Sequence, residues 1–453
     1  MNSFLRAAAC AIAACVTAAC ATPQTPASTR IRHVVFIVQE NRSFDNVFHG
    51  FPGADTAGSG LIHTGRRVPL TPVPFTADWD IGHSYANAMR DYDGGKMDGF
   101  DLERVGEWPG AIGPKPAQKY PQYAYLPRVQ VEPYWQMARS YVLADRMFQS
   151  NLDQSFAAHL YLIAGQAART ADVPSGRPWG CDAMQETWVL TITDQRKKGP
   201  VVYPCFTIRT LADELDAHAL TWRYYAPRVT PAAVWRKVLA RKMRFSAIDS
   251  NKGPDFGQLW SAFDAIAPVR YGYEWASNVV SPETRVLSDV NRGELANVTW
   301  VIPDMKNSDH ATSKSATGPA WVASVVNAIG ASKYWNDTAI FIVWDDSGGW
   351  YDHVPPPQLD YDGLGGRVPL IVVSPYARKG YVSHTVYEFG SLLKFAEETF
   401  GLAPLAASDR RANSLIDCFD FTQPPRAFTP VPARLPALHF EHERPSNVAP
   451  DND

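Results

Sequence analysis

Two stretches of the chain share one pattern, in which a short uncharged run of β-branched and aromatic residues breaks abruptly into acidic and amide side chains. Residues 33–45 read HVVFIVQENRSFD, and residues 339–353 read AIFIVWDDSGGWYDH. Uncharged runs of this length predict strands buried on both faces of a sheet. Ligands bind beyond the carboxyl ends of the strands in open α/β sheets. If the two strands are parallel neighbours, we therefore expect their polar ends to meet at one rim.

The polar ends of these strands form a candidate metal site. Its expected ligands are Glu40, Asn41, Asp345 and Asp346. Carboxylate and amide oxygens suit hard cations. Two adjacent carboxylates can share an ion only where the backbone turns, and Gly348–Gly349 permits such a turn. Helix capping by Asn41 and a solvated acidic turn are the alternative interpretations.

Further apolar runs alternate with helical patterns along the chain. Strands are expected at residues 221–226, 298–302, 338–344 and 368–373, and helices at 132–143, within 148–165, and at 210–219, 319–329 and 387–400. This alternation predicts a three-layer α/β/α domain with a central, mostly parallel sheet. We expect this catalytic domain to span residues 31–421, and a proline-rich C-terminal tail to follow over residues 422–453.

The composition supports a folded domain and argues against a nucleic-acid partner. The chain has 453 residues, of which 45% are hydrophobic and 20% charged, so a sizeable core can form. Its net charge of −3 provides no broad basic face for nucleic acid. Anionic substrates remain compatible with this charge, because a bound metal ion can supply the positive field.

Residues 1–20 predict an export signal. A single charge at Arg6 precedes a run of small and apolar residues that is too short to span a bilayer. The signal is either cleaved beside Cys20 or ends in a lipoprotein box that lipidates Cys20, and both alternatives stay open. Residues 21–30 are expected to form a flexible linker. The mature protein is then periplasmic, extracellular or anchored to the outer membrane, with membrane contact through a lipidated Cys20 or through its substrate.

Export places the cysteines beyond Cys20 in an oxidising compartment. These cysteines are Cys181, Cys205 and Cys418. We expect Cys181 to pair with Cys205, because they lie 24 residues apart in one loop-rich region. Three buried thiols are the alternative.

A serine and four histidines are candidates for catalysis. Ser155 begins a predicted helix, where backbone N–H groups and the helix dipole favour phosphate oxygens. A metal beside it would make its hydroxyl nucleophilic, whereas simple helix capping is the alternative. The histidines are His83, His159, His310 and His353. Each alone is typical of a structural hydrogen-bonding residue, but together they indicate a phosphate-binding or proton-transfer cluster.

Aromatic residues crowd the same loops. They are Trp79, Tyr85, Tyr224, Tyr225, Trp350 and Tyr351. These rings either pack beneath the loops or form a wall that could receive a quaternary ammonium group. The sequence contains no P-loop, no HExxH and no GxSxG motif, and the absence of a C-x-P-x-R or S-x-P-x-R motif disfavours a sulfatase.

Five motifs in chain order resemble the bacterial phosphoesterase family, which contains the non-haemolytic-type phospholipases C and a group of acid phosphatases. The motifs are HVVFIVQENRSFDNVFHGFPG, DGGKMDGF, NLDQSFAAHLYLIAG, WVIPD…SDH and IVWDDSGGWYDHVPPP, and they run from about residue 31 to residue 420. The resemblance implies an alkaline-phosphatase-like fold and a metal held by the four expected ligands. It also implies that Ser155 forms a phosphoseryl intermediate and that the four histidines surround the phosphate.

The resemblance further implies an exported, metal-dependent phosphoesterase whose substrate is a phospholipid head group or a small phosphomonoester. Phospholipase C-type diester cleavage is the first expectation, and acid phosphatase activity on monoesters is the second. A non-catalytic surface protein that binds phosphorylated ligands is the alternative of another class. The residues leave Ca, Mg, Mn, Zn and Fe open as the metal.

Overall fold

The computed structural model describes residues 30–106, 115–176, 179–227 and 261–444. The export signal and all but the last residue of the predicted linker lie outside these ranges, so both stay predictions, as do the domain boundaries. Within the described ranges, no helix is long and apolar enough to cross a membrane.

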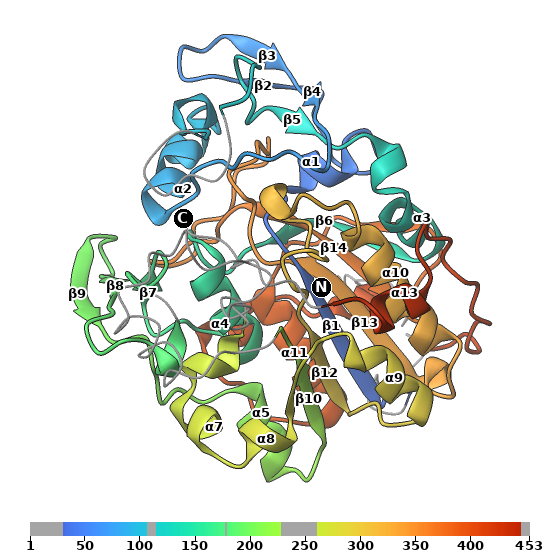
Figure 1. Ribbon diagram of the computed structural model, residues 1–453. Coiled ribbons are helices and arrows are strands. Elements are labelled where there is room, and N and C mark those ends of the chain that lie inside the picture. The colour runs from blue at the N-terminus through green and yellow to red at the C-terminus, as the bar shows by residue number, and fades with distance from the viewer. Residues whose placement is uncertain (1–29, 107–114, 177–178, 228–260, 445–453) are drawn as a thin grey trace, which may run out of the picture.

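A nine-stranded sheet forms the centre of the described residues (Figure 1). Its order is β11-β10-β12-β1-β13-β14-β6-β15, and β16 also pairs with β6. The strands are β1 (His33–Gln39), β6 (Val142–Phe148), β10 (Trp222–Tyr225), β11 (Val279–Val280), β12 (Val298–Val301), β13 (Thr338–Trp344), β14 (Arg367–Val373), β15 (Tyr381–Ser383) and β16 (Tyr387–Glu388). Only β14 runs antiparallel to its neighbours, β13 and β6, within this sheet. The predicted mostly parallel sheet is confirmed.

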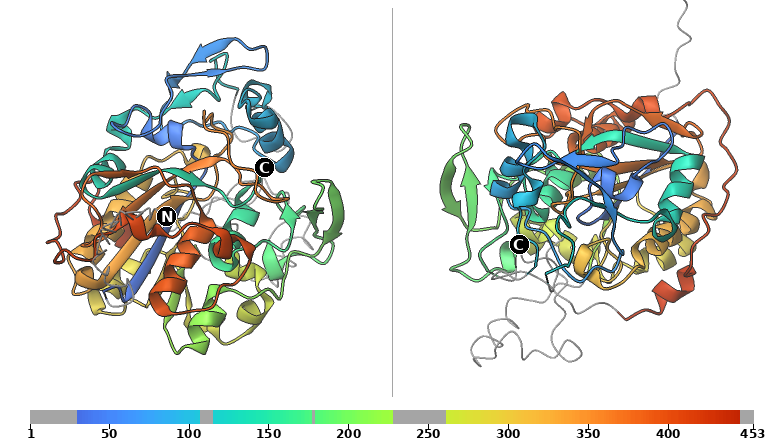
Figure 2. Two further views of the ribbon diagram at one scale, coloured as in Figure 1. Left: turned by 180° about the vertical axis from the view of Figure 1, so that it is seen from behind. Right: turned by 90° about the horizontal axis from the view of Figure 1, so that it is seen from above.

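Helices cover both faces of the sheet, which gives the three predicted layers (Figures 1 and 2). One layer contains α3 (Glu132–Ser140), α9 (Arg285–Arg292), α10 (Gly318–Gly330) and α13 (Ala437–Glu441), and the other contains α4 (Ser155–Ala164) and α11 (Phe389–Phe400). Every residue of α4 is buried, as expected of a helix that is apolar around its whole circumference. This helix ends at Gly165, whose φ of 64° closes the last turn in the left-handed conformation.

Strand β6, next to last in the order of the sheet, is an element that the sequence pattern did not predict. Asp145 and Arg146 interrupt its apolar run. In the fold both charges have partners, because Asp145 accepts a hydrogen bond from His384 at 2.9 Å and Arg146 pairs with Asp55 at 2.6 Å. The strand therefore tolerates two charges that a strand buried on both faces does not normally carry.

The C-terminal tail packs onto α10 over its described part. Phe440 is fully buried and its ring lies 5.4 Å from that of Trp321. Asn327 exchanges two hydrogen bonds with the main chain of Val431, at 2.9 and 2.8 Å. Residues up to 444 thus complete the outer helical layer.

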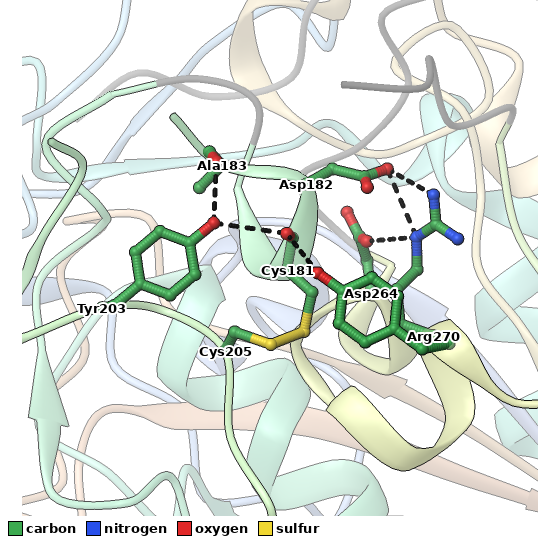
Figure 3. The surroundings of a disulfide bond; sticks show 8 residues. Cys181, Asp182, Ala183, Tyr203, Cys205, Asp264 and Arg270 are labelled. Atoms are coloured by element: carbon green, nitrogen blue, oxygen red, sulfur yellow. Dashed lines mark hydrogen bonds and ion pairs between the residues drawn. A yellow bond between two sulfur atoms is a disulfide. The ribbon is translucent and has the colours of Figure 1, made fainter. Parts of the chain in front are cut away.

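The chain between α4 and α5 (Leu211–Ala217) forms a small antiparallel sheet of β7 (Thr170–Ala171), β8 (Val189–Ile192) and β9 (Lys198–Val202). The predicted disulfide between Cys181 and Cys205 is present, which confirms that pairing, and Cys418 is a buried thiol. Figure 3 shows that Arg270, in α7 (Ala267–Tyr271), pairs with Asp182 beside the bridge. Bridge and ion pair together fix this excursion to the body of the protein.

Candidate active site

The carboxyl ends of β1 and β13 lie side by side, and the loops that leave them touch. The two strands are parallel and stay in register up to Gln39 opposite Trp344. Asn41 has a φ of 55°, in the left-handed region that asparagine tolerates better than most residues. Gly348 has a φ of 61° and packs against the backbone of Asn41, so that a side chain at position 348 would collide with it. The glycine therefore allows the two strand exits to approach each other.

Three buried side chains converge tightly enough to hold one metal ion. One ligand atom from each of Glu40, His159 and Asp345 lies within 4.8 Å of the other two. His159 Nε2 is 3.1 Å from Glu40 Oε1 and 3.5 Å from Asp345 Oδ2, and these side chains are at most 1% exposed. Two carboxylates and an imidazole in this arrangement are a donor set for a divalent ion. Because like charges repel in a buried site, a cation or a proton must lie between the carboxylates.

The same contacts set the protonation of Asp345. Burial alone raises the pKa of this carboxyl group, but its polar neighbours, His159 foremost and then Glu40 and Ser155, outweigh burial and hold the pKa below its ordinary value. Asp345 Oδ1 also accepts a hydrogen bond from the backbone N–H of Asn41 at 3.1 Å. The charged form of the carboxylate, which is the form that binds metal, is thus favoured.

Ser155 is the first residue of α4, and its side chain is fully buried beside the donor triad. Its Oγ donates a hydrogen bond to Asp346 Oδ2 at 3.1 Å. Asp346 Oδ1 in turn accepts from the backbone N–H of Gly348 at 2.7 Å. The serine hydroxyl is therefore oriented by a carboxylate that is itself held by the turn, next to the N–H groups of a helix start.

His83 lies next to Asn41. Its Nδ1–H donates to the carbonyl of Ile81 at 2.6 Å, which leaves Nε2 as an acceptor in the neutral ring. The amide nitrogen of Asn41 lies 3.0 Å from this Nε2 and donates to it. His83 thereby orients the side-chain amide of Asn41, so that the amide oxygen points away from His83.

His310 occupies a third loop, after β12. Its Nδ1 accepts hydrogen bonds from the backbone N–H and the hydroxyl of Thr312, at 3.2 and 2.9 Å. The proton of the neutral ring is therefore on Nε2, which lies 3.8 Å from Asp80 Oδ2. Asp80 is in the same short segment as His83, so the two histidine-bearing loops meet here.

His353 belongs to a different cluster. Its Nδ1 lies 2.6 Å from Asp45 Oδ2 and its Nε2 lies 2.9 Å from Asp55 Oδ1. The fully buried Arg367 joins the same cluster through Asp352 at 2.8 Å. Within the described residues, no recorded contact of His353 reaches Ser155 or the donor triad. The structure thus brings Ser155, His83 and His159 to the strand exits but engages both ring nitrogens of His353 elsewhere.

A cavity opens beside the serine and its neighbours. Its lining includes His83, Asp346, Ala88, Leu152 and Phe100. The crowded aromatic residues do not form this wall as a group, because all six are buried. Trp79, for example, packs on Trp350 with ring centroids 5.3 Å apart, which favours the packing interpretation.

Arg42 is a residue of the site region to which the sequence pattern assigned no role. It is fully buried, and its Nε donates to the carbonyl of Asp309 at 2.7 Å. Burial lowers the pKa of Arg42 to about 10, and its guanidinium lies 5.1 Å from the centre of the Trp350 ring. The sequence signal for Arg42 was its position, because it is a charged residue that closely follows a buried strand. This arginine joins the loop of Asn41 to the loop of His310.

Comparison with known proteins identifies a family and several relatives. The sequence model of the Phosphoesterase family matches residues 31–403. The non-hemolytic phospholipase C of Pseudomonas aeruginosa is 25% identical over 448 residues, which cover 87% of this chain and 58% of that protein. Phospholipase C A of Mycobacterium tuberculosis is 23% identical, with 89% and 79% covered, and non-specific phospholipase C1 of Arabidopsis thaliana is 24% identical, with 90% and 74% covered. The chain thus spans little more than half of the first relative.

Solved structures show only a distant likeness. A protein of the alkaline phosphatase superfamily from Vibrio parahaemolyticus aligns with a TM-score of 0.37 at 9% identity, covering 87% of this chain and 74% of that one. The lipoteichoic acid synthase LtaP from Listeria monocytogenes aligns with a TM-score of 0.33 at 8% identity, covering 87% and 76%. Scores this low say nothing about the residues of the site.

Proposed function

Because the chain belongs to the Phosphoesterase family, we propose that it is an exported, metal-dependent phosphoesterase of the phospholipase C type with Ser155 as its nucleophile. The observation that carries the proposal is the hydrogen bond from Ser155 Oγ to Asp346, next to the buried triad of Glu40, His159 and Asp345. A nucleophile, a base and a metal donor set then lie within one small region, as phosphoryl transfer requires.

The donor triad would hold one divalent ion, and that ion would supply positive charge opposite the phosphate oxygens. This assignment gives His159 a different part from the one expected, since its Nε2 lies with the carboxylates rather than apart from them. Asn41 and Asp346 remain candidate ligands at the edge of the triad. A mixed nitrogen and oxygen set favours Zn, Mn or Fe over Ca or Mg.

Side chains and backbone N–H groups of the chain account for the remaining catalytic roles. Asp346 orients Ser155 and accepts its proton as Oγ attacks phosphorus. The first N–H groups of α4 stabilise the phosphoryl oxygens. His310, whose Nε2 carries a proton, is our candidate for donating that proton to the leaving alkoxide, and His83 positions Asn41. Water then hydrolyses the phosphoserine.

The relatives named phospholipase C favour a diester substrate over a monoester. Acid phosphatase activity on monoesters is the second candidate. Export is supported by the Cys181–Cys205 disulfide, because such bonds persist in oxidising compartments.

The test is turnover of p-nitrophenyl phosphate and of its phosphocholine diester by Ser155→Ala. We expect diester turnover to fall roughly a thousand-fold or more, because the nucleophile is gone, while metal content by elemental analysis stays the same. The matched control is Ser150→Ala, which removes another buried hydroxyl five residues upstream, one that donates to Glu388 at 2.9 Å. Undiminished turnover by Ser155→Ala would eliminate the covalent mechanism, and turnover of the monoester alone by the unmodified protein would eliminate the phospholipase assignment.

A further inference from the structure

The surface around the β8–β9 hairpin collects exposed apolar side chains. In the described part of the chain, nine large apolar residues are exposed, and five of them lie here. These five, which we term the hairpin patch, are Trp188 (46% exposed), Val201 (53%), Tyr203 (39%), Tyr271 (68%) and Tyr273 (79%). A concentration of this kind on an otherwise polar surface marks an interaction site.

Two features connect residues of the patch. Trp188 and Tyr203 directly flank the last pair of the β8–β9 ladder, Val189 opposite Val202. The hydroxyl of Tyr271 donates to the carbonyl of Cys181 at 2.9 Å, and that of Tyr203 is shared between the carbonyls of Ala183 and Cys181, at 2.7 and 3.2 Å. Figure 3 shows Tyr203 directed at these carbonyls beside the disulfide. The disulfide-bearing loop therefore holds the two tyrosines together.

Positive charge accompanies the patch at the hairpin turn. Arg196, Lys197 and Lys198 follow one another there, and both lysines are exposed. The neighbouring Asp194 is already paired with Arg169 at 2.8 Å. In a chain of net charge −3, this turn is a local concentration of basic side chains.

The hairpin packs near the wall of the cavity beside the active site. Ile192 of β8 packs with Leu152, which lines the cavity, and with Tyr85 of α2 (Tyr85–Tyr92). Arg196 fixes the turn from the other side by donating to the carbonyl of Asp360 at 2.7 Å. Figure 1 places α2 and the β7–β9 sheet on the same side of the molecule, and both views of Figure 2 show the hairpin projecting from the body.

From this arrangement we propose that the hairpin patch docks onto the head-group region of a phospholipid surface that contains anionic lipid. Tryptophan and tyrosine favour the interface between water and lipid because their rings are apolar and one end is polar. Lys197 and Lys198 match the charge of anionic head groups. Docked in this way, the enzyme would present its cavity to the lipid layer. The inference rests on the proposed phospholipid substrate.

The test measures binding and turnover separately with the full chain. Binding is co-sedimentation with vesicles of phosphatidylcholine containing a minor fraction of phosphatidylglycerol, and turnover uses the water-soluble p-nitrophenyl phosphocholine diester. Lys197→Gln combined with Lys198→Gln should lower vesicle partition about five-fold for each lysine, which corresponds to roughly 1 kcal/mol each. Trp188→Ser combined with Val201→Ser should also lower it several-fold. Both double variants should keep their turnover of the water-soluble diester.

The control is Val129→Ser combined with Lys379→Gln, which removes an exposed valine (65% exposed) and an exposed lysine away from the hairpin. This variant should bind vesicles as the unmodified protein does. Unchanged partition in both hairpin variants, an equal loss in the control, or no vesicle binding by the unmodified protein would overturn the docking proposal. If the unmodified protein binds vesicles through the patch but does not hydrolyse the diester, the proposed function fails while the docking surface stands.

Discussion

Replacing Arg367 by methionine should destabilise the fold strongly, because this arginine compensates two buried carboxylates. Its side chain is fully buried, with Nε 2.8 Å from Asp352 Oδ1 and Nη2 3.4 Å from Asp45 Oδ1. Its Nη1 also donates to the carbonyls of Asp55 and Asp145, both at 2.9 Å. Methionine keeps the apolar stem but leaves Asp352 without its cation, whereas Asp45 keeps its contact with His353.

The expected loss is about 3–5 kcal/mol in the free energy of unfolding, the usual cost of removing one partner from a buried ion pair. Equilibrium urea unfolding without reductant, followed by tryptophan fluorescence, measures it. Arg128→Met is the matched control, since Arg128 is half-exposed in its pair with Glu132 and its loss should change stability little. If uncompensated charge is the cause, adding Asp352→Asn to Arg367→Met should restore part of the loss. A loss no larger than that of the control would refute this reasoning.

Three further outcomes are expected. Glu40→Gln should lower the content of bound metal by elemental analysis, because it removes one of the two carboxylates of the donor triad. Gly348→Ala should reduce diester turnover more than stability, since its Cβ would lie 2.8 Å from Asn41 Cβ. Gly58→Ala, with no atom within 4 Å of the added carbon, should change neither diester turnover nor stability. Burial alone lowers the pKa of His353, but the hydrogen bond with Asp45 and the neighbouring carboxylates outweigh burial and raise it from 6.5 to about 9. Its contribution to stability is therefore complete below pH 6.5 and is lost as pH rises through about 9, so the difference in unfolding free energy between the unmodified protein and His353→Gln should shrink over that range.

The parts of the fold that sequence pattern predicts are those with an uninterrupted signal. The runs of β1 and β13 carry no charge, and their shared break into polar residues indicated that they end at one rim. Strand β6 carries Asp145 and Arg146, whose partners His384 and Asp55 lie far away in sequence. No local pattern reveals such long-range compensation. The antiparallel direction of β14 is likewise a property of the sheet and not of its own residues.

The site shows the same division between local and long-range information. The spacing of four residues between Ser155 and His159 correctly placed both on one face of a helix. Whether His159 meets metal donors or phosphate depends on Glu40 and Asp345, which reach it from other elements. His353 follows the acidic pair closely in sequence, yet its nitrogens contact the carboxylates of Asp45 and Asp55, downstream of β1. Sequence proximity to the acidic pair did not predict the contacts of His353, because the chain turns at Gly348 between them.

Two buried arginines explain how a site so rich in carboxylates can fold and still bind a cation. Arg42 donates to the loop of Asp309, and Arg367 pairs with Asp352, so each braces a loop next to the site. Neither guanidinium takes part in the triad of Glu40, His159 and Asp345. The two arginines therefore stabilise the loops beside the site, and the negative charge of the triad remains available to bind a cation. Because an ion that binds the folded state alone stabilises it, loading the site should raise the unfolding temperature of the unmodified protein more than that of Glu40→Gln.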